Sequence, residues 1–227
     1  RARVPARVFV PADARPAKLR AIERADAELV RVEGDRADVT AACHDAVAAG
    51  DGWYASHAWN PAFYAGTATF AYEVAAQRDW SVPDAVVLPV GHGTLFLGAY
   101  RGFRRLHDAG WTDDVPRMLA VQAAGNAPLA AALGNATEGA NERADGIHIA
   151  APARRDQLLD AVADSDGDAI AVDGAATEAA LDALHGAGLY VEPTSAAALA
   201  GLRAYRERGT LDGGDVVVAL TGSGLKS

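Results

Sequence analysis

The sequence has one cysteine, one methionine and only two lysines among its 21 basic residues. A single cysteine, Cys43, allows no disulfide within the chain and no cysteine-rich metal site, a usage typical of a reducing compartment. No apolar run approaches the roughly 20 residues that a membrane-spanning helix needs, and no signal-peptide pattern opens the sequence. We therefore expect a cytoplasmic protein without a membrane partner and without a metal site.

Positive charge is also scarce. The 21 basic residues face 30 acidic ones, which gives a net charge of −9. Such a surface lacks the basic face that neutralises the phosphates of nucleic acid, so we expect no nucleic-acid partner, although a small anionic ligand can still bind locally. Half of the 227 residues are hydrophobic, which is enough to bury a large core in one or two domains.

Strands and helices alternate in the first part of the chain. Apolar patterns predict strands at 7–11, 28–32 and 52–55, with helices at about 16–27 and 36–49 between them. This alternation predicts a parallel sheet with right-handed crossovers. A linker with the breaker residues Asn60, Pro61 and Gly66 follows. It predicts a domain boundary there, with residues 1–62 in one α/β domain and 63–227 in another.

The second part continues the alternation. Strands are expected at 86–89, 117–122, 168–172 and 215–220, and helical patterns lie between them, beginning with residues 67–77. The polar segment 134–146 has no periodicity and is interpreted as a long loop near the site or a mobile flap. Thr194 or Ser195 is expected to cap the helix before the last strand.

One strand, turn and helix start predicts a binding site. Val86 to Pro89 forms the strand, Gly91 and Gly93 free the backbone of the turn, and helical spacing begins at Thr94. Such a turn points backbone N–H groups and the positive end of the helix dipole at one place, where a phosphate can bind. A G-x-G turn after a strand is also common without any ligand.

A second glycine-rich loop, Thr221 to Lys226, follows the last strand. Ligands of open α/β sheets collect outside the carboxyl ends of the strands, so the two loops can face a single ligand.

The order of motifs along nearly the whole chain resembles that of threonine synthase-like enzymes, members of the pyridoxal-phosphate family with the tryptophan synthase β-like fold. The motifs are Asn60-Pro61, Gly66-x-x-Thr69-x-x-x-Glu73, Pro89-Val90-Gly91-His92-Gly93-Thr94, Val121-Gln122, Glu192-Pro193-Thr194-Ser195-Ala196-Ala197 and Leu220-Thr221-Gly222-Ser223-Gly224-Leu225-Lys226. The resemblance implies an α/β fold of two doubly wound parallel-sheet domains. Residues 1–62 are then the remaining part of the small N-terminal domain, and 63–227 the large cofactor-binding domain.

The resemblance also implies a cofactor site for pyridoxal 5'-phosphate. The loop Val90, Gly91, His92, Gly93 and Thr94 matches the one whose backbone amides hold the cofactor phosphate. Thr221 matches the hydroxyl residue that hydrogen-bonds the pyridine nitrogen. Taken by itself, such a residue is more often a turn hydroxyl that is satisfied locally. A neutral partner makes the ring a weaker electron sink than a carboxylate would, which suits elimination and replacement chemistry.

The activity implied is that of a lyase of amino-acid metabolism. The first expectation is the threonine synthase reaction, in which O-phospho-L-homoserine and water give L-threonine and phosphate. Alternatives within the fold are a threonine or serine dehydratase or another β-elimination or β-replacement enzyme, and an alternative of another class is a non-catalytic module that binds a phosphorylated ligand. Relatives of this kind bind a small amino-acid substrate and are often homodimers.

Two departures from the family pattern stand out. Catalysis needs a Schiff-base lysine, and neither Lys18 nor Lys226 lies in the expected context, so we expect that lysine upstream of Arg1 and a chain that is an inactive fragment by itself. The family's arginine three residues after the asparagine of Asn-Pro, which binds the substrate phosphate, is replaced by Phe63, and a nearby serine by Ala58.

The second departure leaves two interpretations open. Either another group, such as Arg143, supplies the positive charge, or the substrate carries no phosphate. The aromatic residues Trp59, Phe63 and Tyr64 are equally consistent with packing. His57 and His92 are the histidines expected near the site, where each could act as an acid or base.

Overall fold

The computed structural model describes residues 4–14 and 16–226, without the side chains of residues 17, 18, 36 and 226. It divides the chain into two compact units, Arg1–Ser56 and His57–Ser227. Among the described residues, no helix has both the length and the apolar content needed to cross a membrane.

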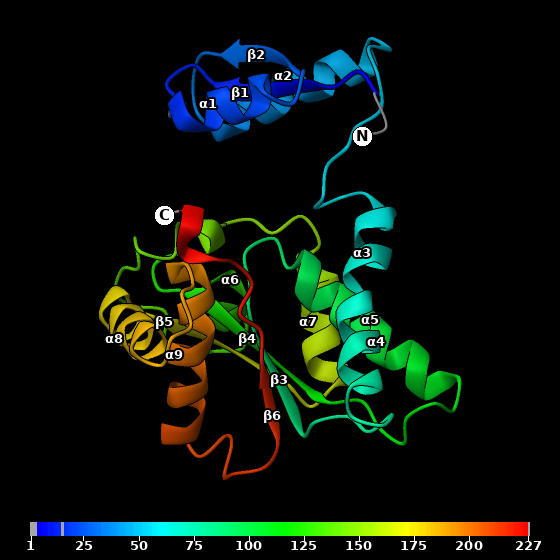
Figure 1. Ribbon diagram of the computed structural model, residues 1–227, viewed down its shortest axis with the longest axis vertical. Coiled ribbons are helices and arrows are strands. Elements are labelled where there is room, and N and C mark those ends of the chain that lie inside the picture. Colours follow the sequence, from blue (N-terminus) through cyan, green and yellow to red (C-terminus); the bar gives the residue numbers. More distant parts are fainter. Residues whose placement is uncertain (1–3, 15, 227) are drawn as a thin grey trace. The chain divides into compact units, whose positions relative to one another are not determined.

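The first unit contains a two-stranded parallel sheet with two helices (Figure 1). Its elements are β1 (Arg7–Pro11), α1 (Pro16–Glu23), β2 (Glu28–Val32) and α2 (Arg36–Ala48). The side chain of Asp35 caps α2 by accepting the backbone N–H groups of Ala37 and Asp38. The expected third strand at 52–55 is wrong. That segment pairs with no strand among the described residues. Trp53 within it is 71% exposed, so the aromatic residues that suggested a buried strand are not buried in one.

The second unit is built on a four-stranded parallel sheet. Its strands are β3 (Ala85–Pro89), β4 (Arg117–Ala123), β5 (Asp168–Val172) and β6 (Val216–Val218), and their order in the sheet is β5-β4-β3-β6. All five residues of β3 are buried, because helices cover both faces and a parallel strand then presents apolar side chains to each side. β6 lies at the edge of the sheet and is only half-buried.

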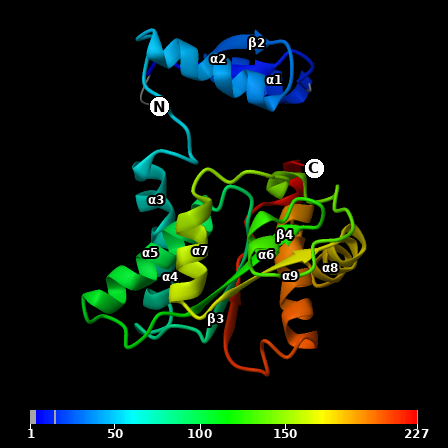
Figure 2. The same cartoon turned by 180° about the vertical axis from the view of Figure 1, so that it is seen from behind.

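Helices cover the two faces of this sheet unequally (Figures 1 and 2). On one face lie the helices α3 (Pro61–Thr67), α4 (Thr69–Ala76), α5 (Thr94–Asp108) and α7 (Arg155–Asp164), and on the other lie α8 (Gly174–Gly186) and α9 (Pro193–Glu207). Successive residues of β3 point to opposite faces. Val86 and Leu88 therefore join the first core, and Ala85 and Val87 the second. This arrangement is the doubly wound α/β fold expected from the sequence.

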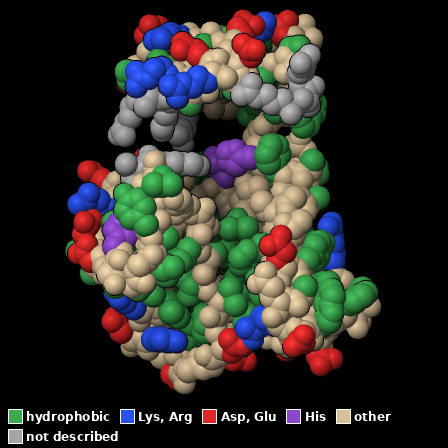
Figure 3. Space-filling view, viewed as in Figure 1, with side chains coloured by type: hydrophobic (Ala, Val, Ile, Leu, Met, Phe, Trp, Pro, Cys, Tyr) green, Lys and Arg blue, Asp and Glu red, His purple; other side chains and the backbone are tan. Residues whose placement is uncertain are grey.

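Shorter elements complete the second unit. They are the helix α6 (Pro128–Ala132) and the 3-10 turns η1 (Asp145–Ile147) and η2 (Gly224–Lys226). The surface between α9 and α4 is rich in hydrophobic side chains (Figure 3), where the half-buried strand β6 leaves one edge of the sheet uncovered.

The segment expected as a linker is instead helix α3. Its breaker residues begin the helix: the Oδ1 of Asn60 accepts the N–H of Ala62 at 2.9 Å, and Pro61 occupies the first turn, where its missing N–H costs nothing. The single helix expected at 67–77 begins only at Thr69, after a break at Ala68. The chain divides before this helix, at Ser56, whereas the boundary expected at 62/63 falls inside α3.

Candidate functional site

The turn after β3 is shaped by its two glycines. Gly93 has a φ of +74° in the left-handed region that favours glycine, and a Cβ there would overlap the buried side chain of Leu158 on α7. A Cβ on Gly91 would lie 3.1 Å from the side chain of Ile149 and 3.2 Å from backbone atoms of residues 146 and 147. The turn thus passes so close to residues 146–149 and to Leu158 that it has no room for side chains at the two glycines, and its backbone is what a ligand would meet.

This turn presents the amino end of α5. Gly93 is the N-cap residue, and it has no side chain to accept the first N–H groups of the helix. Val90 is held in place because its N–H donates to the carbonyl of Val121 on β4 at 2.8 Å. An uncapped start of a 15-residue helix behind a glycine turn leaves backbone N–H donors and a partial positive charge directed at one place. That combination fits a phosphate group.

The second loop lies at the same end of the sheet as the glycine turn, because both follow the carboxyl ends of their strands. β3 and β6 are parallel neighbours, with Val87 opposite Val218, and the N–H of Ala219 donates to the carbonyl of Val87 at 3.1 Å. Thr221 follows two residues later and is exposed. The structure therefore brings Thr221 to the carboxyl end of the sheet, where the residues of the glycine turn also lie: Val90, Gly91, His92, Gly93 and Thr94.

Ser195 has a role that sequence reasoning missed. It does not cap α9, nor does Thr194, because the helix begins earlier with Glu192 as its N-cap. The Ser195 side chain is instead fully buried, and its Oγ accepts the N–H of Gly222 at 2.7 Å and lies 3.4 Å from the Thr221 Oγ1. Ser195 thus anchors the loop that carries Thr221. The sequence did contain a signal, a hydroxyl residue in the first turn of α9, but we interpreted it as an N-cap because serine is common at that position.

His57 and His92, the two histidines expected near the site, lie next to each other. Their rings meet edge-on with centroids 5.6 Å apart, and the carbonyl of His57 accepts the Thr94 hydroxyl at 3.3 Å. His148 and His185 instead bind backbone carbonyls, of Asn141 and Val191, and so serve local structure.

The described residues fit part of the expected cofactor. The glycine turn suits the phosphate of pyridoxal phosphate, and the hydroxyl of Thr221 is a neutral partner for the ring nitrogen. The side chains of Lys18 and Lys226 lie outside the described part of the structure. The described residues therefore offer the non-covalent half of such a site.

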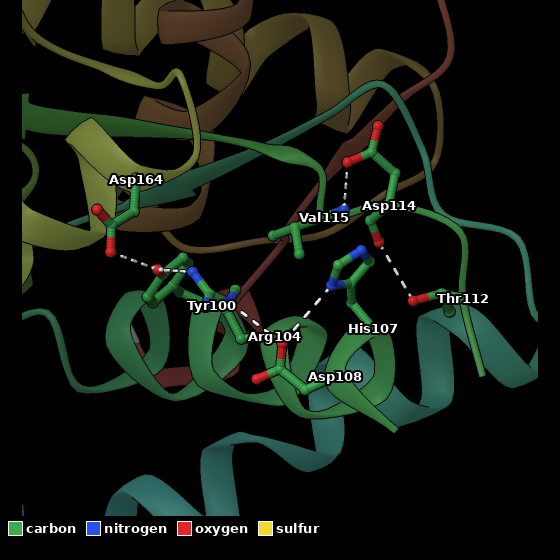
Figure 4. Close-up of polar contacts among 8 residues, drawn as sticks. All are labelled: Tyr100, Arg104, His107, Asp108, Thr112, Asp114, Val115 and Asp164. Carbon is green, nitrogen blue, oxygen red and sulfur yellow. Dashed lines mark hydrogen bonds and ion pairs between the residues drawn. The ribbon is translucent and has the colours of Figure 1, made fainter. Parts of the chain in front are cut away.

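A hollow of about 520 Å³ lies at the opposite end of the sheet from these loops, where β4 begins with Arg117. Its charges are paired (Figure 4): Arg104 approaches Asp108 at 3.9 Å and donates to the Tyr100 hydroxyl, which in turn donates to Asp164 at 2.9 Å. Burial and the bond to Asp164 raise the pKa of Tyr100. Because ligands of such sheets bind at the carboxyl ends of strands and these charges satisfy one another, we interpret this hollow as structural.

Comparisons with known proteins agree on one family. The family model described as "Pyridoxal-phosphate dependent enzyme" matches residues 1–222. A threonine synthase of Methanosarcina acetivorans is 34% identical over 175 residues, which are 74% of this chain and 43% of that protein. A threonine synthase of Mycobacterium tuberculosis is 36% identical over 172 residues, which are 74% of this chain and 46% of that protein. This chain thus spans less than half of the length of the curated relatives it matches.

Solved structures show the same fold. An L-serine ammonia-lyase from Rhizomucor miehei is 26% identical, with a TM-score of 0.74 over 97% of this chain and 70% of that chain. A serine racemase from Dictyostelium discoideum is 20% identical, with a TM-score of 0.77 over 98% of this chain and 69% of that chain, and at that identity it supports the fold alone.

Proposed function

This chain belongs to the pyridoxal-phosphate-dependent enzyme family, and from that premise we propose that it forms the cofactor-binding part of an amino-acid lyase. The observation that carries the proposal is that two loops follow the carboxyl ends of the neighbouring strands β3 and β6. One loop leads into the uncapped start of α5, and the other contains Thr221. The same end of the sheet accounts for both ends of the cofactor, since one loop suits its phosphate and the other its ring.

The residues have distinct roles in this proposal. The backbone N–H groups of the turn from Val90 to Thr94 bind the phosphate, and the close packing of Gly91 and Gly93 keeps those groups accessible. Thr221 holds the ring nitrogen without protonating it, and Ser195 fixes the position of that hydroxyl. When bound, pyridoxal phosphate withdraws electrons from the α carbon of an amino acid. The chain itself orients the cofactor for that chemistry.

The reaction proposed first is that of threonine synthase. The curated relatives with this activity are 34% and 36% identical to the chain over about three quarters of its length. A dehydratase acting on threonine or serine is the second candidate, because Phe63 and Ala58 stand where a substrate-phosphate site would have an arginine and a serine. A non-catalytic module that binds a phosphorylated ligand is a candidate of another class. A small amino-acid substrate, a homodimer and a cytoplasmic location belong to the same proposal.

The experiment is a product assay on the full-length gene product. Phosphate release and threonine formation from O-phospho-L-homoserine would establish the first candidate. Ammonia release from threonine or serine, without phosphate release, would establish the second. A colourless protein to which borohydride attaches no pyridoxyl group would contradict both and leave the binding module. For residues 1–227 alone we expect little turnover, because the described residues offer no lysine side chain at the site.

A further inference from the structure

Two arginines stack on the ring of Tyr64. The guanidinium carbon of Arg101, on α5, lies 5.1 Å from the ring centroid, and that of Arg154, just before α7, lies 4.9 Å from it. Tyr64 is held in place because it is buried and its hydroxyl donates to the carbonyl of Ala58 at 2.6 Å. Arg154 also lies 5.8 Å from the ring of Trp59 and donates to its carbonyl. The aromatic rings thus fix the planes of both cations.

Neither cation has an anionic partner in the part of the chain that the structure describes. Among the described residues, the ion pairs include neither Arg101 nor Arg154. Both donate instead to one neutral oxygen, the Oε1 of Gln157, at 2.7 and 3.4 Å. The Nε of Arg154 is buried and has no acceptor in the described part of the chain. Burial, and then repulsion from the nearby charge of Arg154, lowers the pKa of Arg101.

Two neighbouring arginines that share no carboxylate are unusual in a chain of net charge −9. Both arginines that line the hollow have carboxylates nearby. Arg104 approaches Asp108 at 3.9 Å (Figure 4), and Arg117 approaches Asp166 at the same distance. Arg143, the alternative source of charge considered from the sequence, is paired with Glu178 at 2.9 Å. Arg101 and Arg154 therefore differ from these arginines in that a bound anion would relieve an unfavourable arrangement instead of breaking an existing ion pair.

The arginine pair is connected to the candidate cofactor site through helices α3 and α5. Trp59 and Tyr64 flank the segment that contains Phe63. Helix α3 is joined to the glycine turn through the Thr67 hydroxyl, which donates to the carbonyl of Thr94 at 2.9 Å. Arg101 is seven residues beyond Thr94, about 10 Å along α5 at the usual rise per residue, so the pair is separate from the turn. Trp59 and Phe63 are 50% and 41% exposed, which leaves this region accessible to a ligand.

We propose that Arg101 and Arg154 form an anion subsite for the phosphate group of the substrate. The proposal rests on the proposed function, and it narrows the substrate class to phosphorylated amino acids. Two planar guanidinium groups offer several N–H donors to the three oxygens of a phosphate monoester. They supply the positive charge that Phe63 does not.

The test is a calorimetric titration of residues 1–227 with inorganic phosphate, repeated with saturating pyridoxal phosphate to occupy the glycine turn. Arg154→Gln is expected to weaken phosphate binding at the subsite about tenfold or more, since it removes charge-assisted hydrogen bonds. Arg154→Lys is expected to restore part of the affinity, because the charge remains. The control is Arg155→Gln, which removes the same charge from the adjacent position, where Arg155 pairs with Asp156 at 3.6 Å, and is expected to change binding less than about twofold.

The outcomes separate the two proposals. Equal phosphate affinity in the wild type and in the folded Arg154→Gln variant, measured with the glycine turn occupied by pyridoxal phosphate, would overturn the subsite. Equal losses in Arg154→Gln and Arg155→Gln would also overturn it, because the effect would then be one of net charge. Phosphate binding that depends on Arg154, together with a full-length gene product that binds no pyridoxal phosphate, would support the subsite and overturn the proposed function.

Discussion

The Oγ of Ser195 accepts the backbone N–H of Gly222 at 2.7 Å, and this bond joins the start of α9 to the loop that carries Thr221. The hydroxyl also donates to the carbonyl of Gly222 at 3.1 Å. One buried side chain thus fixes both polar groups of a residue adjacent to the proposed cofactor ligand. This contact helps to hold the loop, together with the backbone bond from the N–H of Glu192 to the carbonyl of Gly222 at 3.1 Å, since β6 itself is short and half-buried.

Replacement of Ser195 by alanine should loosen this loop. The change leaves the N–H of Gly222 without its acceptor, which we expect to cost about 1–3 kcal/mol of unfolding free energy. Affinity for pyridoxal phosphate should fall as well, because Thr221 is no longer held. Urea denaturation and a cofactor titration measure the two effects. Ser223→Ala is the matched control, because that side chain is exposed and, among the described residues, accepts only the N–H of Leu225 at 3.3 Å. Equal effects of both substitutions would contradict the role given to Ser195.

Replacement of Gly93 by alanine separates backbone strain from close packing. Gly93 and Gly110 have nearly the same φ, +74° and +72°, but a Cβ on Gly110 would meet no atom within 4 Å. We expect Gly110→Ala to cost about 1 kcal/mol, from the left-handed conformation alone. Gly93→Ala should cost about 1–3 kcal/mol more, because Leu158 is buried and has no room to move. Similar losses of stability for the two variants would show that the turn is not packed as described.

Tyr205 should make stability fall at alkaline pH. The side chain is fully buried and its hydroxyl donates to the carbonyl of Ala120 at 2.8 Å, and burial raises the pKa of this phenol well above its usual value of 10. The folded state therefore keeps a proton that the unfolded chain loses, so the stabilisation is complete below pH 10 and is lost as the pH rises above that value. Tyr205→Phe should flatten the decline in unfolding free energy between about pH 10 and 11, and Tyr100→Phe should do so less, since Tyr100 is less buried. A decline unchanged in Tyr205→Phe would contradict this assignment.

The second unit should fold without the first. Both hydrophobic cores consist of residues of the second unit only, from Tyr64 to Ala219. We expect residues 57–227 to unfold cooperatively and to keep the phosphate affinity of the whole chain. Circular dichroism during urea denaturation checks the first expectation, and calorimetry the second. A non-cooperative transition would show that the second unit needs the first to complete its core.

The sequence predicted the parts of the fold that rest on strong periodicity or on continuous apolar runs. β3 and β4 are buried on both faces, and their apolar runs were recognised with nearly the observed bounds. The errors concern signals with two meanings. Asn60 and Pro61 are found both in linkers and at helix starts. The packing of Tyr64 against the core favours the helix α3, and this contact is not visible in the sequence. The aromatic segment at 52–55 matches a strand locally but has no partner strand to bond with.

The candidate site was predictable to a similar extent. The glycine turn and Thr221 were identified because their backbone requirements are local, and their roles as cofactor ligands stay predictions. Ser195 and the stacking of Arg101 and Arg154 on Tyr64 were not identified, since each depends on contacts between residues at least 27 positions apart. No local pattern encodes such contacts, and the structure is needed to find them.

The most direct test of the account is the binding of pyridoxine 5'-phosphate, which has the ring and phosphate of the cofactor but no aldehyde to react with a lysine. Titration of residues 1–227, followed by protein fluorescence, should show saturable binding. Gly91→Val should weaken it at least about tenfold, and Thr221→Val by a smaller factor. Equal affinity in the wild type and in a folded Gly91→Val variant would contradict the claim that the carboxyl end of the sheet holds the cofactor.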